Sequence, residues 1–120
     1  MNDKQLHVDV TLSGHNVAVI DLKGEIDIYT APEFQSALTH AIEEGFRRVV
    51  VDVSKVTFMD STGLGVFVGG QRKMHLCDGL LVVVCTDPTI TRIFQITGLA
   101  DVFTFRETRN EALKVATDWP

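Results

Sequence analysis

Two stretches decide the fold, Val49-Val50-Val51 and Leu80-Leu81-Val82-Val83-Val84. Both are continuous aliphatic runs without the polar alternation that marks a half-buried strand. Strands that are apolar on both faces are typical of parallel sheets covered by helices. We therefore expect the two stretches to pair within a mostly parallel sheet that is covered on both faces.

The chain upstream of these stretches predicts a β-hairpin. Residues 6–12 alternate apolar and polar side chains, which indicates a half-buried strand. The turn residues Ser13-Gly14-His15-Asn16 separate this segment from a second apolar segment, residues 17–22. Two such segments joined by a short turn form an antiparallel pair.

Helix starts are marked by capping residues. Thr30-x-x-Glu33 and Thr108-x-x-Glu111 have the capping-box pattern, and Asp87-Pro88 is a third start signal. A fourth helix is expected after a strand that ends near Val53, because parallel strands need a crossover connection. Its natural cap is Asp60 or Ser61.

These elements follow the order β-β-α-β-α-β-α-β-α, with a short strand at residues 102–105 before the last helix. The order predicts an α/β fold with one mixed, mostly parallel sheet and packed helices. The chain has 120 residues, of which 45% are hydrophobic, and this suffices for one core. We expect a single domain over residues 1–120, with an ordered core at about residues 5–117.

The composition argues against several classes of function. The net charge is −5, and no cluster of Lys or Arg indicates a surface for nucleic acid or for an anionic membrane. The start of the chain is polar and no apolar run reaches the length of a membrane span, so we expect a cytoplasmic protein. Cys77 and Cys85 lack zinc-site spacing and the histidines are scattered, so we expect neither a metal nor a cofactor.

The segment from Val56 to Gly70 departs from what stability alone would favour. It carries four glycines at the start of the expected helix, each of which costs about 0.8–1.0 kcal/mol relative to Ala. Such glycines permit close approach of the backbone to the sheet or to an outside partner. The adjacent apolar residues 66–68 span about 200° of the helix surface. Either another element covers the far side, or one of residues 64 and 66–68 is exposed as part of a partner-binding patch.

Known catalytic patterns do not fit this segment. The spacing Gly63-x-Gly65-x-x-x-Gly69 misses the dinucleotide fingerprint by one position, and Ser61 lacks the flanking glycines of a hydrolase elbow. A receiver domain with Asp52 or Asp60 as phosphate acceptor would need further acidic residues after the first strand and a late lysine. These are missing, so we expect no catalytic residues and no enzymatic activity.

The stretch Met59-Asp60-Ser61-Thr62-Gly63-Leu64-Gly65 resembles the phosphorylation-site signature of bacterial anti-sigma-factor antagonists, which are members of the STAS domain family. Residues 24–27 and 30–33 resemble the segment between the family's second strand and first helix. Residues 93–99 resemble its late helix and turn. The matches occur in the family's order along most of the chain.

The resemblance implies a phosphorylation switch. In the family, an anti-sigma factor that is also a serine/threonine kinase phosphorylates the serine after the aspartate, here Ser61, and a protein phosphatase reverses the modification. The unphosphorylated antagonist binds the kinase and thereby frees a sigma factor. The resemblance also implies that Asp27 lies near the phosphoacceptor. We expect the partner-binding residues to be Asp27, Asp60, Thr62, Gly63, Leu64, Val66 and Phe67.

Other interpretations remain open from the sequence. The local residues alone favour Ser61 as a plain helix cap, and Thr62 is a second candidate phosphoacceptor. A STAS domain can also be a soluble subunit or regulator of a membrane transport complex. The intact Asp60-Ser61-Thr62-Gly63 favours the antagonist over that alternative.

Overall fold

The computed structural model describes residues 5–120, and residues 1–4 of the expected domain lie outside this range. The predicted order of elements is confirmed. The strands are β1 (Leu6–Ser13), β2 (Val17–Ile26), β3 (Arg48–Met59), β4 (Leu80–Val84) and β5 (Thr104–Arg106). The helices are α1 (Ala31–Glu43), α2 (Ser61–Leu76), α3 (Pro88–Ile96) and α4 (Arg109–Asp118).

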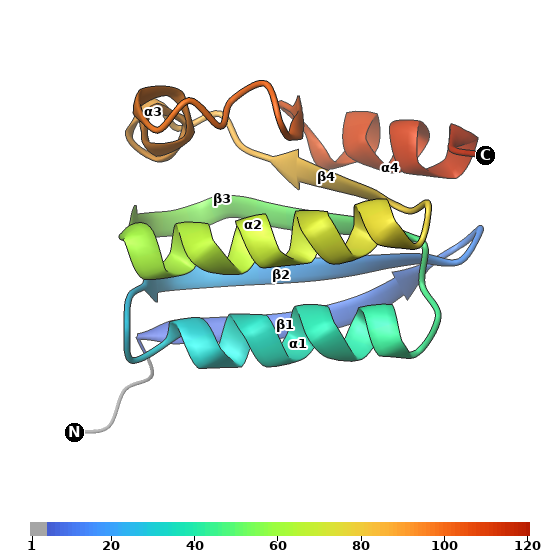
Figure 1. Cartoon of the computed structure of the whole chain (residues 1–120), viewed down its shortest axis with the longest axis horizontal. Coiled ribbons are helices and arrows are strands. Elements are labelled where there is room, and N and C mark those ends of the chain that lie inside the picture. Colours follow the sequence, from blue (N-terminus) through green and yellow to red (C-terminus); the bar gives the residue numbers. More distant parts are fainter. Residues whose placement is uncertain (1–4) are drawn as a thin grey trace.

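The strands form one mixed sheet in the order β1-β2-β3-β4-β5 (Figure 1). β1 and β2 are the predicted antiparallel hairpin, and β2 to β5 pair in parallel. The two aliphatic stretches lie side by side at its centre, where Val50 is opposite Val82. The prediction of a mostly parallel sheet is therefore confirmed.

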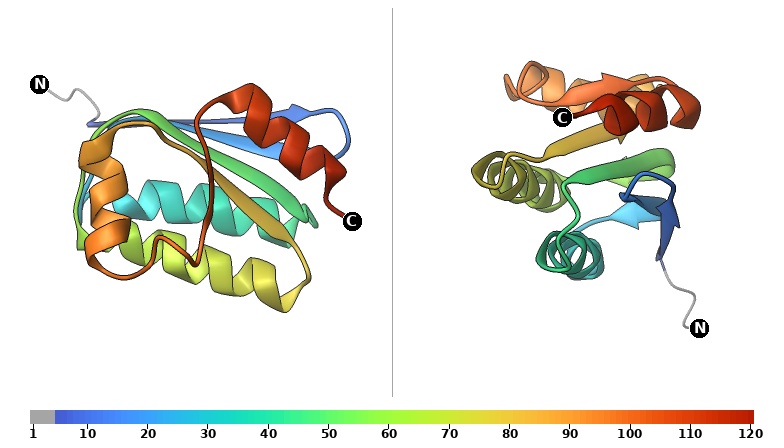
Figure 2. Two further views of the ribbon diagram at one scale, coloured as in Figure 1. Left: turned by 90° about the horizontal axis from the view of Figure 1, so that it is seen from above. Right: turned by 90° about the vertical axis from the view of Figure 1, so that its right-hand side faces the viewer.

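Helices cover both faces of the sheet, but unequally. α1, α2 and α3 lie on one face and α4 lies on the other, as the two views in Figure 2 show. The larger core lies under α1 to α3, and it includes the side chains of Phe34, Phe67 and Phe94. The smaller core lies under α4, where Ala112 and Ala116 pack on valines of β2, β3 and β4.

The apolar surplus of α2 is covered by other elements. The Phe67 ring is fully buried, with its centroid 4.8 Å from that of Phe34 in α1 and 5.4 Å from that of Phe94 in α3. Leu64 and Val66 expose only 7% and 9% of their surface. Val68 is half-buried. Leu64, Val66 and Phe67 therefore offer little free surface, and their expected role in partner binding stays a prediction.

Three local expectations need correction. β3 does not end near Val53 but continues to Met59, because β2 is also longer than predicted and Ile26 pairs with Met59. Thr30 precedes α1 without a side-chain capping bond, since its hydroxyl oxygen accepts from the Asp27 N–H at 2.9 Å instead. The last strand begins at Thr104 rather than at residue 102.

Candidate functional site

The candidate site lies at the edge of the sheet where β2 and β3 end. The Asp60 N–H donates a 3.1 Å hydrogen bond to the Ile26 carbonyl, next to the pair formed by Ile26 and Met59. This bond fixes the loop of residues 27–30 beside the start of α2, at the left end of Figure 1. Gly63 allows the close approach, since a Cβ there would lie 2.6 Å from Ile26 Cγ2. The predicted partner residue Gly63 is thus a buried packing position.

Asp60, and not Ser61, caps α2. One oxygen of its carboxylate accepts hydrogen bonds from the N–H groups of Thr62 (2.8 Å) and Gly63 (3.3 Å). Ser61 is the first residue of the helix, and its side chain is exposed. Its hydroxyl makes no hydrogen bond to any of residues 5–120, so the fold does not depend on it. The interpretation of Ser61 as a plain helix cap is therefore wrong.

The loop beside Ser61 is held rigid by Asp27. The Asp27 carboxylate accepts from the N–H groups of Tyr29 (2.9 Å) and Thr30 (3.0 Å). The Thr30 hydroxyl donates to the Glu25 carbonyl at 2.8 Å, which closes the turn. The resemblance implied that Asp27 lies near Ser61. Its loop lies beside the start of α2, but its carboxylate is used for hydrogen bonds inside the loop.

This rigid loop presents two apolar side chains that the sequence analysis missed. Ile28 is 64% exposed and Tyr29 is 85% exposed. Large apolar residues with this exposure, adjacent on a rigid loop, are typical of a binding surface. The sequence does contain one sign of this: Ile28 and Tyr29 stand between Asp27 and Thr30 in a turn, where polar side chains are usual.

A shallow groove continues from this loop along the seam of α1 and α2. A depression of about 190 Å³ lies between Ile28 and Thr62, and it adjoins one of about 80 Å³ farther along the seam. Gly65 and Gly69 line this groove, and a Cβ on either would meet no atom within 4 Å. These two glycines are not required by internal packing, so they keep the groove open at the surface.

Asp52 belongs to a different cluster, on the face that α4 covers. Its carboxylate accepts from the Arg109 guanidinium at 3.0 Å, and Arg109 also pairs with Asp21. Burial alone would raise the pKa of Asp52, but hydrogen bonds from Ser54 and Arg109 and the charge of Arg109 hold that pKa below its ordinary value of 3.8. These contacts anchor the start of α4 to the sheet.

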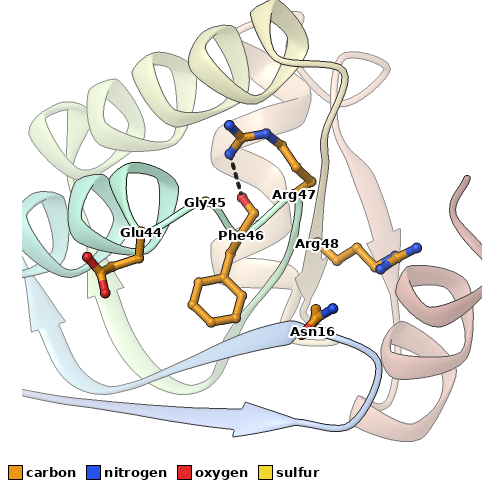
Figure 3. A pocket seen from close by; sticks show the side chains of 6 residues that line it. All are labelled: Asn16, Glu44, Gly45, Phe46, Arg47 and Arg48. Atoms are coloured by element: carbon orange, nitrogen blue, oxygen red, sulfur yellow. Dashed lines mark hydrogen bonds between the residues drawn. The ribbon is translucent and has the colours of Figure 1, made fainter.

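A cavity of about 290 Å³ lies at the opposite end of the sheet, where β3 begins (Figure 3). Two arginines line it, and both donate to main-chain carbonyls. Arg47 donates to the Phe46 carbonyl at 3.2 Å, the bond drawn in Figure 3, and Arg48 donates to the Trp119 carbonyl at 2.8 Å. The two arginines thus hold the segment after α1 and the C-terminal segment near the start of β3, remote from Ser61.

Within residues 5–120, none of the helices is both long and apolar enough to cross a membrane. In the same range, no three His, Cys, Asp or Glu side chains are grouped so that they would hold a metal ion.

Comparison with known proteins places these features in a family. A family model for the STAS domain matches residues 9–112. The anti-sigma-B factor antagonist of Staphylococcus aureus strain NCTC 8325 is 39% identical over 88 residues, which cover 73% of this chain and 82% of that protein. An anti-sigma factor antagonist from Mycobacterium paratuberculosis superposes with a TM-score of 0.87 at 29% identity, covering 94% of this chain and 95% of that one.

A likeness of fold alone extends to SpoIIAA. Its unphosphorylated form superposes with a TM-score of 0.78 at 24% identity, covering 91% of this chain and 95% of that one. The phosphorylated form of SpoIIAA superposes with a TM-score of 0.73. The match to the family model and the similarity to two antagonists agree with each other. The chain belongs to the STAS domain family, and within that family it groups with the anti-sigma-factor antagonists.

Proposed function

We propose that this chain is a binding module switched by phosphorylation. In its unphosphorylated form it binds an anti-sigma factor that is a serine/threonine kinase, and this binding releases the sigma factor in the cytoplasm. The kinase transfers phosphate to Ser61, which ends the binding, and a protein phosphatase restores the active form. The observation that carries the proposal is the exposed Ser61 hydroxyl, which the fold leaves unused beside the Asp60 carboxylate.

Phosphorylation at this position changes the surface and leaves the core unchanged. A phosphate adds about −1.5 to −2 charges, and here it would lie beside a carboxylate that already holds the N–H groups of Thr62 and Gly63. The start of α2 therefore has little capacity to neutralise the new charge. A partner that docks here would bury this charge without an opposite charge beside it. An unpaired buried charge costs several kcal/mol, so the phosphorylated form should bind weakly.

Docking energy in this proposal comes from the loop next to the switch. Tyr29 and Ile28 are exposed beside Ser61, and tyrosine is one of the residues that dominate binding energy at protein interfaces. Asp27 fixes the loop before binding, so little conformational entropy is lost when the partner docks. Apolar contact and the phosphate site thus belong to one surface, made of Asp27, Ile28, Tyr29, Asp60, Ser61 and Thr62.

A phosphorylation assay tests the assignment of the residue. The chain is incubated with its anti-sigma kinase and Mg-ATP, and the modified residue is mapped by mass spectrometry. We expect phosphate on Ser61 in the wild type and in Thr62→Ala, and no phosphate on Ser61→Ala. Phosphate on Thr62 in place of Ser61 would show that Thr62 is the modified residue. A wild type that accepts no phosphate would contradict the proposal.

A further inference from the structure

The edge strand β1 is a part of the molecule that the proposed switch does not use. Within residues 5–120, β2 is the only strand paired with β1, so the outer side of β1 is open. β1 is 8 residues long, contains no Pro or Lys, and pairs with β2 in an unbroken register. Proline, charged side chains such as lysine, and bulges are the usual devices that keep an edge strand from pairing with another chain. β1 has no proline and no bulge, and Asp9 is its only Asp, Glu, Lys or Arg.

The open edge presents main-chain groups at a regular spacing. The Glu25 N–H donates to the Gln5 carbonyl at 2.7 Å, and in an antiparallel pair such bonded positions alternate along the strand. With the register of β1 and β2, the odd-numbered residues of β1 bond to β2. The even-numbered residues Val8, Val10 and Leu12 therefore direct their N–H and C=O groups toward the open side.

An apolar surface accompanies these main-chain groups. The side chains of Val10 and Leu12 are 48% and 68% exposed, on the face of the sheet that α1 covers. A cavity of about 260 Å³ lies beside them, between β1 and α1, and Ala37 and Ala41 are in its lining. Contiguous apolar surface of this kind marks a place where another molecule docks.

We propose that β1 pairs with β1 of a second copy of this chain, antiparallel, to form a closed two-fold dimer. With the axis at Val10, Val10 is opposite Val10 and Val8 is opposite Leu12 of the second copy, so every outward main-chain group in this stretch gains a partner. The same register places Asp9 opposite Thr11 of the second copy, and no like charges face each other.

Two other registers of the same pair are less favourable. An axis at Asp9 would place two carboxylates directly opposite each other, which destabilises a sheet. An axis at Val8 would leave Leu12, the most exposed side chain of the strand, outside the paired segment. Of these three registers, the axis at Val10 is the most favourable.

The rest of the molecule is compatible with a dimer that closes. The other edge strand, β5, has only 3 residues, so it offers no edge of matching length for head-to-tail growth. Ser61 follows the end of β3, whereas the axis at Val10 crosses the middle of β1. Because a two-fold axis reverses the strand direction, the two Ser61 sites lie at opposite ends of the dimer and both stay accessible.

Thr11 allows a test in which only the sign of a charge changes. Thr11 is exposed, and in the proposed register it faces Asp9 of the second copy at two symmetric places. Thr11→Lys creates two pairs of opposite charge and should tighten the dimer, whereas Thr11→Asp creates two pairs of like charge and should weaken it. In sedimentation equilibrium at low ionic strength, we expect their dissociation constants to differ at least tenfold, with the wild type between them. Circular dichroism checks that both variants are folded.

Amide hydrogen exchange of the wild type gives a second readout. The amides of Val8, Val10 and Leu12 should exchange fast in dilute solution and slowly at high protein concentration. The amides of Asp9 and Thr11, which bond to β2, should be protected at both concentrations. In sedimentation equilibrium, the proposal is overturned if the wild type has the mass of one chain at every concentration, if it assembles beyond two copies, or if the two Thr11 variants have equal dissociation constants. In hydrogen exchange, it is overturned if the exchange rate of the Val10 amide does not change with protein concentration.

Discussion

The N–H of Asp60 donates a 3.1 Å hydrogen bond to the carbonyl of Ile26, and this bond joins the end of β2 to the cap of α2. It holds the loop that carries Ile28 and Tyr29 beside Ser61. The surface that we propose for the partner therefore consists of two segments that are distant in sequence and fixed to each other by the sheet. A change of charge at Ser61 acts on this rigid surface directly.

The exposed tyrosine next to the switch should be an anchor for the partner. We expect Tyr29→Ala to weaken binding of the anti-sigma kinase at least tenfold, which corresponds to about 1.4 kcal/mol, while the stability of the domain stays the same. Isothermal titration calorimetry measures the binding. Leu76→Ala is the matched control, because Leu76 is 78% exposed but lies at the other end of α2. Equal effects of the two substitutions would remove Tyr29 from the binding surface.

Replacing either of two glycines of α2 with alanine should change the free energy of unfolding, but in opposite directions. A Cβ at position 63 would lie 2.6 Å from Ile26 Cγ2 and 2.7 Å from Met59 Cγ, so Gly63→Ala should lower the free energy of unfolding by about 1–3 kcal/mol. A Cβ at position 65 meets nothing within 4 Å, so Gly65→Ala should raise that free energy by up to about 1 kcal/mol. Urea denaturation measures both. A loss of stability in Gly65→Ala would show that the groove is more closely packed than we describe.

The ion pair of Asp52 and Arg109 should make stability depend on pH in acid. Because the pKa of Asp52 is lower in the folded chain than its ordinary 3.8, the stabilisation is complete above that value and is lost as the pH falls through the lower, folded pKa. We expect Asp52→Asn to cost about 1–2 kcal/mol at neutral pH, since Arg109 is 41% exposed and partly screened.

The same substitution should flatten the loss of stability in acid, which urea denaturation at a series of pH values would show. The control is Asp101→Asn, at an exposed position, which should change neutral-pH stability by less than about 0.5 kcal/mol. An Asp52→Asn variant with the acid sensitivity of the wild type would assign that sensitivity to other carboxylates.

Sequence analysis predicted those parts of the fold that local pattern determines. The aliphatic stretches gave the central parallel strands, and the capping box at Thr108 is present with both of its hydrogen bonds. The box expected at Thr30 is absent because Asp27 occupies both groups that would form it: the Thr30 N–H donates to the Asp27 carboxylate, and the Thr30 hydroxyl oxygen accepts from the Asp27 N–H. Such a competition depends on the turn geometry, which the residue pattern does not specify.

The candidate site was predicted less completely than the fold. Ser61 is at a helix start as expected, yet Leu64, Val66 and Phe67 are core residues, because the coverage of α2 depends on where α1 and α3 pack. Periodicity within one helix contains no information about these neighbours. Ile28 and Tyr29 were missed for a related reason, since exposure of a loop residue follows from the turn that Asp27 makes.

We propose that the charge state of Ser61, and not the fold, controls partner binding. Calorimetric titration of the anti-sigma kinase with unphosphorylated chain and with chain phosphorylated on Ser61 tests this dependence most directly. Circular dichroism should show that both forms are folded. Ser61→Ala and Ser61→Glu are the matched variants; the first should bind like the wild type and the second should bind poorly. We predict tight binding of the unphosphorylated form and at least tenfold weaker binding of the phosphorylated form. Equal affinities of the two forms would contradict the account.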